Sequence, residues 1–158
     1  MPKSPLEESQ QEMKRGNWAR KIVDRLERDQ SPEERLDVAD QRLSSAIRKF
    51  GTDGGASANA RADVAKRLEE LGRYAEARLL RQEVLGANQV RLGSEHPHTL
   101  IAQSWLILNL RESGMNAEAR PLAMHLYETR KVALGPYHED TKWAADLLAA
   151  IDRDGQSL

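Results

Sequence analysis

The sequence predicts an all-α fold, built from one pair of helices that is repeated along the chain. The stretch between Gly72 and His96 recurs further along the chain, with Gly114 and His138 in the same places. Recurrence at a period of about 42 residues is typical of arrays in which each unit buries its apolar face against its neighbours. Leu, Ala, Arg and Glu dominate the composition, and all four favour helices over strands.

Composition narrows the possible classes of protein. The chain has 158 residues, of which 39% are apolar and 31% charged, as expected for one folded domain. Its 24 basic and 25 acidic residues nearly balance, so we expect no nucleic-acid partner. The absence of cysteine excludes disulfides and thiolate chemistry. No apolar run is long enough to span a membrane or to act as a signal peptide, so we expect a cytoplasmic protein without a membrane partner.

The N-terminal part contains an arm and then a first helix. Residues 1–15 carry two prolines and mostly polar side chains, and we expect a flexible arm or a short extra helix there. Trp18 is followed by Ile22, Val23 and Leu26 at spacings that place all four on one face of a helix.

The second helix has clear ends. Ser31 is a typical N-cap, and Gly51 ends the pattern. Leu36 and Leu43 stand about one residue away from the apolar positions of the later units, so we expect this helix to be out of register with its counterparts. Residues 51–57 are rich in glycine and predict a flexible connector.

The next two units resemble each other closely. The second unit predicts helices that end at Gly72 and Gly93, where glycine can adopt the left-handed conformation that closes a helix. The third unit repeats this with Gly114 and Gly135. Pro121 lies about five residues into the second helix of that unit, so we expect a late start or a kink there.

A seventh helix over residues 141–153 has few large apolar residues among its charged ones, which is typical of the cap that ends a repeat array. The predicted repeat domain covers residues 16–154, and residues 155–158 form a tail.

Two motifs recur in phase along these units. The first is L-G-x-x-x-E-A, present as Leu71-Gly72 and Glu76-Ala77, and the second is L-G-x-x-H-P-x-T-L, which begins at Leu92. Together they resemble the 42-residue tetratricopeptide repeats of kinesin light chains. The resemblance implies a right-handed superhelical solenoid of antiparallel helix pairs, with about seven helices in three and a half repeats. It also implies a non-catalytic scaffold whose first helices line a concave groove for a protein or peptide partner.

The resemblance further implies which residues line the groove. They are Asn17, Arg20, Lys21, Asp24, Asn59, Asp63, Lys66, Ile101, Ser104, Trp105, Leu108, Arg111, Trp143, Asp146 and Leu147. One groove position in each unit is usually asparagine in that family, and here it holds Lys21, Asp63, Trp105 and Leu147. This departure weighs against the backbone-clamping peptide recognition that is usual in the family.

Two hypotheses account for the apolar end of the groove. Trp105, Leu108, Trp143 and Leu147 form an exposed patch that receives a partner, or else curvature of the stack or a self-association contact buries them. Two hypotheses also account for the charged end of the groove, which is formed by Arg20, Lys21, Asp63 and Lys66. These residues together select an acidic or mixed-charge peptide, or they are only a solvated face. The leading hypothesis is an interaction scaffold, and the alternative is a homo-oligomerising assembly element that uses the apolar end.

Catalysis and metal binding are not indicated. His96 and His138 occupy equivalent loops, where the resemblance implies a structural role at the start of a helix, so we expect no metal and no cofactor. No nucleophile elbow, phosphate-binding loop or zinc-protease motif occurs, so we expect no enzyme. A small-molecule sensor has no polar constellation to support it.

Overall fold

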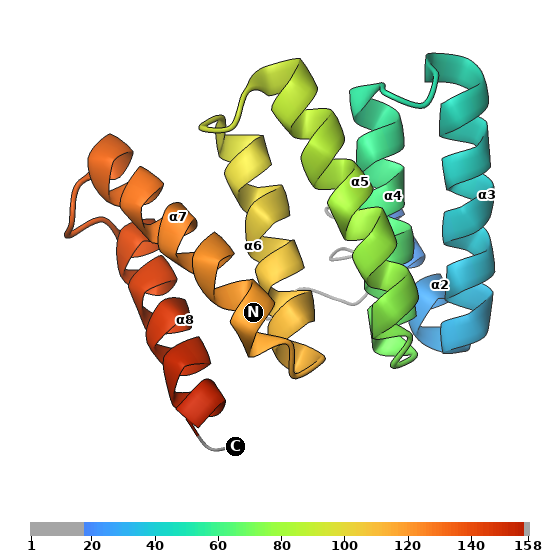
Figure 1. Cartoon of the computed structure of the whole chain (residues 1–158). Coiled ribbons are helices and arrows are strands. Elements are labelled where there is room, and N and C mark those ends of the chain that lie inside the picture. The colour runs from blue at the N-terminus through green and yellow to red at the C-terminus, as the bar shows by residue number, and fades with distance from the viewer. Residues whose placement is uncertain (1–17, 157–158) are drawn as a thin grey trace, which may run out of the picture.

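The computed structural model describes residues 18–156, which form seven helices and no strand (Figure 1). The helices are α2 (Trp18–Asp29), α3 (Pro32–Phe50), α4 (Gly55–Glu70), α5 (Tyr74–Leu92), α6 (Pro97–Glu112), α7 (Asn116–Leu134) and α8 (Glu139–Gln156). The predicted all-α fold is confirmed. The predicted arm and Asn17 lie outside the described residues.

The period of the sequence is present in the backbone itself. Helices α3, α5 and α7 all have 19 residues, and they begin at Pro32, Tyr74 and Asn116, at equal intervals along the chain. The prediction that α3 is out of register is therefore wrong for the backbone. Its ends are set by the capping box at Ser31 and by Gly51, and not by the positions of its leucines.

Glycines end both the first and the second helices of the units. Gly51, Gly72, Gly93, Gly114 and Gly135 are equally spaced along the chain, and their φ angles lie between 74° and 92°. Other residues are strained in this left-handed region, so glycine is required there. At the end of α4, for example, the amide after Gly72 donates to the carbonyl of Leu68 at 2.8 Å, which satisfies one of the last carbonyls of the helix.

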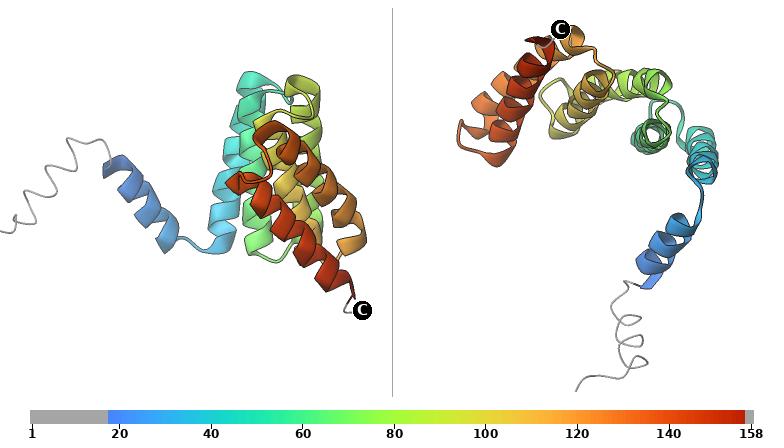
Figure 2. Two further views of the ribbon diagram at one scale, coloured as in Figure 1. Left: turned by 90° about the vertical axis from the view of Figure 1, so that its left-hand side faces the viewer. Right: turned by 90° about the horizontal axis from the view of Figure 1, so that it is seen from below.

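The helices stack in one direction, each against the next, and build a curved array (Figure 2). Their buried apolar residues form two successive clusters, one over α3, α4 and α5 and one over α4 to α8. The core thus runs along the array and does not surround a single centre, which is the arrangement expected of a repeat solenoid. The first helix, α2, is an exception because it projects away from the stack (Figure 2).

Several helix boundaries differ from the prediction. Helix α4 begins at Gly55, inside the predicted connector 51–57, and α8 begins at Glu139 and not at residue 141. The second helix of the third unit begins at Asn116 and continues through Pro121, so the expected late start is wrong. Pro121 and Ala117, whose carbonyl has lost its usual donor, are both exposed, and water can satisfy that carbonyl. The last helix extends to Gln156, which lies within the predicted tail.

Candidate partner-binding groove

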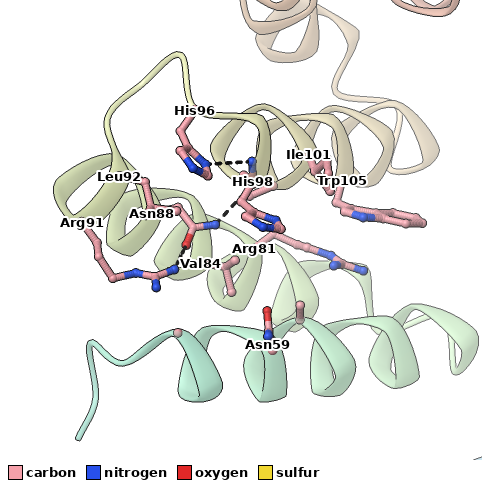
Figure 3. A pocket seen from close by; sticks show the side chains of 13 residues that line it. Asn59, Arg81, Val84, Asn88, Arg91, Leu92, His96, His98, Ile101 and Trp105 are labelled. Carbon is pink, nitrogen blue, oxygen red and sulfur yellow. Dashed lines mark hydrogen bonds between the residues drawn. The ribbon is translucent and has the colours of Figure 1, made fainter. Parts of the chain in front are cut away.

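A pocket of about 400 Å³ opens between three consecutive helices. Helices α4 and α6 lie on the inner side of the arc, α5 lies behind them, and side chains from all three converge on the pocket (Figures 2 and 3). The lining residues are Gly55, Asn59, Ala62, Arg81, Val84, Asn88, Arg91, Leu92, His96, His98, Ile101, Ala102 and Trp105. The volume suits one or two side chains of a ligand.

An aromatic side chain forms the α6 wall of the pocket. Trp105 is 45% exposed, and the guanidinium of Arg81 stacks on its ring at 5.1 Å. Arg81 is itself buried and donates twice to the carboxylate of Glu69, at 2.7 and 3.2 Å. Asn109 Nδ2 donates to the same carboxylate at 2.9 Å. This buried network holds the indole in place and leaves nearly half of it open to solvent.

The opposite part of the pocket is basic. Arg91 donates to the side-chain oxygen of Asn88 at 3.1 Å, and the His96 and His98 rings are stacked 5.4 Å apart. None of the lining residues is an aspartate or a glutamate. Glu69 neutralises Arg81, so Arg91 is the positive charge that remains at the pocket, beside the two imidazoles.

One hydrogen bond of the pocket recurs one unit later, where it holds the start of a helix. His96 Nδ1 accepts from the amide of His98 at 3.2 Å, and His138 Nδ1 accepts from the amide of Asp140 at 3.1 Å. Each ring therefore satisfies a free amide in the first turn of a helix. This is the helix-entry role that the resemblance implied for both histidines.

A second recurring contact ties each loop to the helix before it. The side chain of Asn88 donates to the carbonyl of His98, and the guanidinium of Arg130 donates to the carbonyl of Asp140, both at 3.3 Å. Burial lowers the pKa of Arg130, and the charge of Asp140 opposes that shift. These contacts hold the loops in the same conformation in both units.

The residues that give the pocket its chemistry do not recur. Arg81, Arg91, His98 and Trp105 are followed one unit later by Ala123, Ala133, Asp140 and Leu147. The repeat architecture therefore does not require them. The resemblance placed groove residues only on the first helices of each unit, so it missed Arg81 and Arg91 of α5. It also missed His98, in the first turn of α6, because its groove positions on that helix begin at Ile101. The signal that could have found them is the departure from the repeat at these positions.

The predicted apolar patch is only partly present. Asn59, Ile101 and Trp105 meet in the pocket, and Trp143 is 40% exposed one unit further on, with Arg130 stacked on its ring at 5.3 Å. Two residues predicted to line the groove do not reach it.

These two residues are Leu147 of the patch and Ser104, a predicted groove residue outside the patch, and both are buried. The hydroxyl of Ser104 donates to the carbonyl of Leu100 and accepts from Arg130, while Leu147 belongs to the apolar core. Leu108 is half-buried against that core. Of the two hypotheses for the apolar end, burial therefore holds for Leu147 and exposure for Trp105 and Trp143.

The predicted charged residues lie outside this pocket. Asp63 pairs with Arg67 at 3.5 Å and with Arg42 at 3.8 Å, while Arg111 pairs with Asp154 at 2.8 Å. The remaining members are exposed on α2, α4 and α8, and they are Arg20, Lys21, Asp24, Lys66 and Asp146. Asp63 and Arg111 are therefore engaged within the chain.

Within residues 18–156, no three side chains of the metal-ligating types come together. None of the described helices combines the length and the apolar character that a bilayer span needs.

The fold is similar to that of solved tetratricopeptide-like repeats. One is the crystal structure of nearly identical TPR-like repeats from Podosopora anserina, ascribed to a kinesin light chain, and a second is a variant of the same repeats with one residue replaced. Each matches with a TM-score of 0.76 and 18% sequence identity over 86% of this chain. The match covers 64% of each of those chains. No protein-family model and no curated protein matches the sequence. The resemblance drawn from the two sequence motifs is confirmed for the fold, which is a TPR-like helical-repeat solenoid.

Proposed function

We propose that this protein is a non-catalytic interaction scaffold that binds a segment of a protein partner on the inner side of the array. The observation that carries the proposal is the pocket between α4, α5 and α6, which combines a half-exposed indole with a basic, carboxylate-free lining. TPR-like repeat folds generally serve as protein-interaction scaffolds, which supports the same function.

Trp105 is suited to act as the apolar anchor of that interaction. Tryptophan is among the residues that contribute most to binding when a partner covers them. The ion pair between Arg81 and Glu69 fixes the ring before any partner arrives. Little side-chain entropy is then lost on binding, which favours affinity.

The basic side of the pocket indicates the chemistry of the ligand. A guanidinium binds a carboxylate through charge-assisted hydrogen bonds, and Arg91 lies where such a group could enter. The proposed ligand is therefore a peptide segment in which an acidic residue stands close to a large apolar one. The apolar residue would cover Trp105 and Ile101, and the acidic residue would approach Arg91.

Selection from a random peptide library tests this function. We expect the native chain to enrich peptides with adjacent acidic and apolar residues. Trp105→Ala and Arg91→Glu should each weaken the binding of a selected peptide about tenfold or more. The matched controls are Tyr137→Ala and Lys131→Glu, which change exposed residues away from the pocket.

Two outcomes would reject this function. One is a library that yields no saturable binder, and the other is a selected peptide that binds all four variants equally well.

The alternative function, self-association through the apolar end of the groove, loses support at Leu147 because that side chain is buried. Trp105 and Trp143 remain partly exposed there, and Trp143 is the one outside the pocket. Light scattering of Trp143→Ala beside the native chain tests the alternative, which requires a native oligomer that the substitution dissociates.

A further inference from the structure

Helix α2 carries an apolar stripe that residues 18–156 leave about half open to solvent. Its members are Ile22, Val23 and Leu26, which are 48%, 44% and 57% exposed. The residues at the same positions of the next two units are at most 6% exposed, and they are Val64, Ala65, Leu68, Leu106, Ile107 and Leu110. The stripe is therefore the core-facing side of a first helix, half open in the first unit and closed in the next two.

The stripe is half open because of two residues on α3, the helix that would otherwise pack against it. In the second unit, Ala77 and Val84 of α5 are buried in the apolar clusters. The equivalent positions of α3 hold Arg35 and Arg42. These side chains are too long and too polar for the close approach that alanine and valine permit, because a buried charge requires partners. Helix α2 therefore projects away from α3, as Figure 2 shows.

What connects α2 to the array is a set of ion pairs. Glu27 lies 3.7 Å from Arg67 of α4 and 4.0 Å from Arg42 of α3. Both distances are long. The Arg42 side chain is 56% exposed, so its pair with Glu27 stabilises little, whereas Arg67 is only 11% exposed and its pair is better shielded from solvent. These contacts engage the C-terminal half of α2. Val23 and Leu26 of the stripe border a pocket of about 140 Å³ that α2 shares with α3 and α4, and they remain 44% and 57% exposed. An aliphatic stripe on an exposed helix is unfavourable in water and marks an interaction surface.

We propose that α2 is a self-association helix, and that α2 of a second copy of this chain covers the stripe in the antiparallel direction. The charges beside the stripe support this occupant. Arg20 and Glu27 are two helical turns apart, on one flank of the helix and on either side of the middle of the stripe. An antiparallel copy brings Arg20 of each chain towards Glu27 of the other. The contact is then the same on both chains, as twofold symmetry requires.

The geometry also sets the strength of the association. Twelve residues of helix are only about 18 Å long, so the contact is small and the dimer dissociates on dilution. The groove pocket lies on α4 to α6 and is not part of this contact. The proposal is therefore independent of the function proposed for the pocket.

Sedimentation equilibrium of the full chain, from about 1 µM to 500 µM, tests the association over the range expected for a small interface. We expect a monomer–dimer equilibrium. Leu26→Glu should abolish the dimer, whereas the control Val90→Glu should not, because Val90 is 92% exposed on α5. Circular dichroism checks that both variants keep their helices. A native chain that stays monomeric throughout, or a dimer that Leu26→Glu does not weaken, overturns the proposal.

Because the sequence contains no cysteine, single introduced cysteines can report the direction of the contact. Val23→Cys, near the middle of the stripe, should form a disulfide-linked dimer under mild oxidation, and Val90→Cys should not. A mixture of the Arg20→Cys and Glu27→Cys variants should form more cross-linked dimer than either variant alone. If each variant alone forms more cross-linked dimer than the mixture, the antiparallel arrangement is rejected. A monomer whose Val23→Cys thiol reacts slowly with an alkylating reagent would assign the stripe to residues 1–17 and overturn the proposal.

Discussion

At the scale of single residues, glycines with a positive φ end the helices, and their equal spacing defines the length of each helix and its loop. Gly72 has a φ angle of 74°, whereas Gly86 lies inside α5 without a positive φ. A Cβ atom added at either position would meet nothing within 4 Å. The two glycines therefore differ in backbone conformation and not in available space.

Replacing each by alanine should have opposite effects on stability. We expect Gly72→Ala to lower the free energy of unfolding by about 1–2 kcal/mol, because alanine is strained in the left-handed region. Gly86→Ala should raise the free energy of unfolding by about 0.5–1 kcal/mol, because alanine favours the helix interior. Urea denaturation measures both. Equal effects of the two substitutions would show that backbone conformation does not distinguish the positions.

Three equivalent hydroxyls offer a second comparison. Ser57, Thr99 and Thr141 are fully buried at the same position of successive units. The hydroxyl of Ser57 donates to the carbonyl of Gly51 at 2.6 Å. The hydroxyls of Thr99 and Thr141 have no hydrogen-bond partner among residues 18–156. A buried polar group without a partner reduces stability.

We therefore expect Ser57→Ala to lower the free energy of unfolding by about 1 kcal/mol, because a hydrogen bond is lost and the carbonyl of Gly51 loses a donor. Thr99→Val keeps the shape of the side chain and removes an unpaired hydroxyl, so it should be neutral or stabilising. Thermal unfolding of the two variants checks this order. Destabilisation by Thr99→Val as large as that by Ser57→Ala would contradict it.

At the scale of helices, the first unit differs from the next one at the interface between α2 and α3. Arg35 and Arg42 replace the alanine and valine of the next unit, and α2 separates from its partner. Ala77 and Ala119 are fully buried at the position that Arg35 occupies in the first unit. Close packing of a helix pair thus depends on a small side chain at one position.

Restoring that interface should close the first unit. In the double variant Arg35→Ala, Arg42→Val, we expect α2 to pack on α3 as α4 packs on α5. Amide hydrogen exchange within α2 should slow by about tenfold or more, because local opening then requires the separation of apolar surface. Self-association through the stripe should weaken in the same variant.

The control is Arg48→Ala, which removes an exposed arginine from the same helix. It should leave exchange in α2 unchanged. If α2 exchanges as fast in the double variant as in the native chain, the arginines are not what holds the helix away.

The helices themselves could be predicted from the sequence, because their ends are local signals. The capping box at Ser31 and the glycines require only neighbouring residues. The position of α2 was not predicted, because the apolar stripe looks the same whether or not a partner covers it. The reason for its exposure lies on another helix, at Arg35, and appears only when equivalent positions are compared. The burial of Leu147 was one of two hypotheses that the sequence left open, and that of Ser104 was missed, since both depend on how neighbouring helices curve.

At the scale of the whole molecule, the residues that recur from unit to unit maintain the stack, and those that give the pocket its chemistry do not recur. The buried alanines, the closing glycines and the histidine caps recur from unit to unit, because each unit must pack on the next. Arg81, Arg91, His98 and Trp105 break that pattern, and all four line one pocket. The fold could be predicted from what repeats. Only Trp105 of the pocket could be predicted, because Arg81 and Arg91 come from a second helix and His98 from the first turn of α6, positions that the resemblance did not assign to the groove.

The central claim is that the pocket between α4, α5 and α6 holds a segment of a partner. The most direct test is an NMR titration of the ¹⁵N-labelled full chain with a peptide selected on that chain. We expect saturable shifts at Asn59, His98 and Ile101 and at the indole of Trp105, and we expect them to disappear in Trp105→Ala. Saturable shifts confined to α2 or to the outer surface of α5 and α7, or unchanged binding by Trp105→Ala, would contradict the claim.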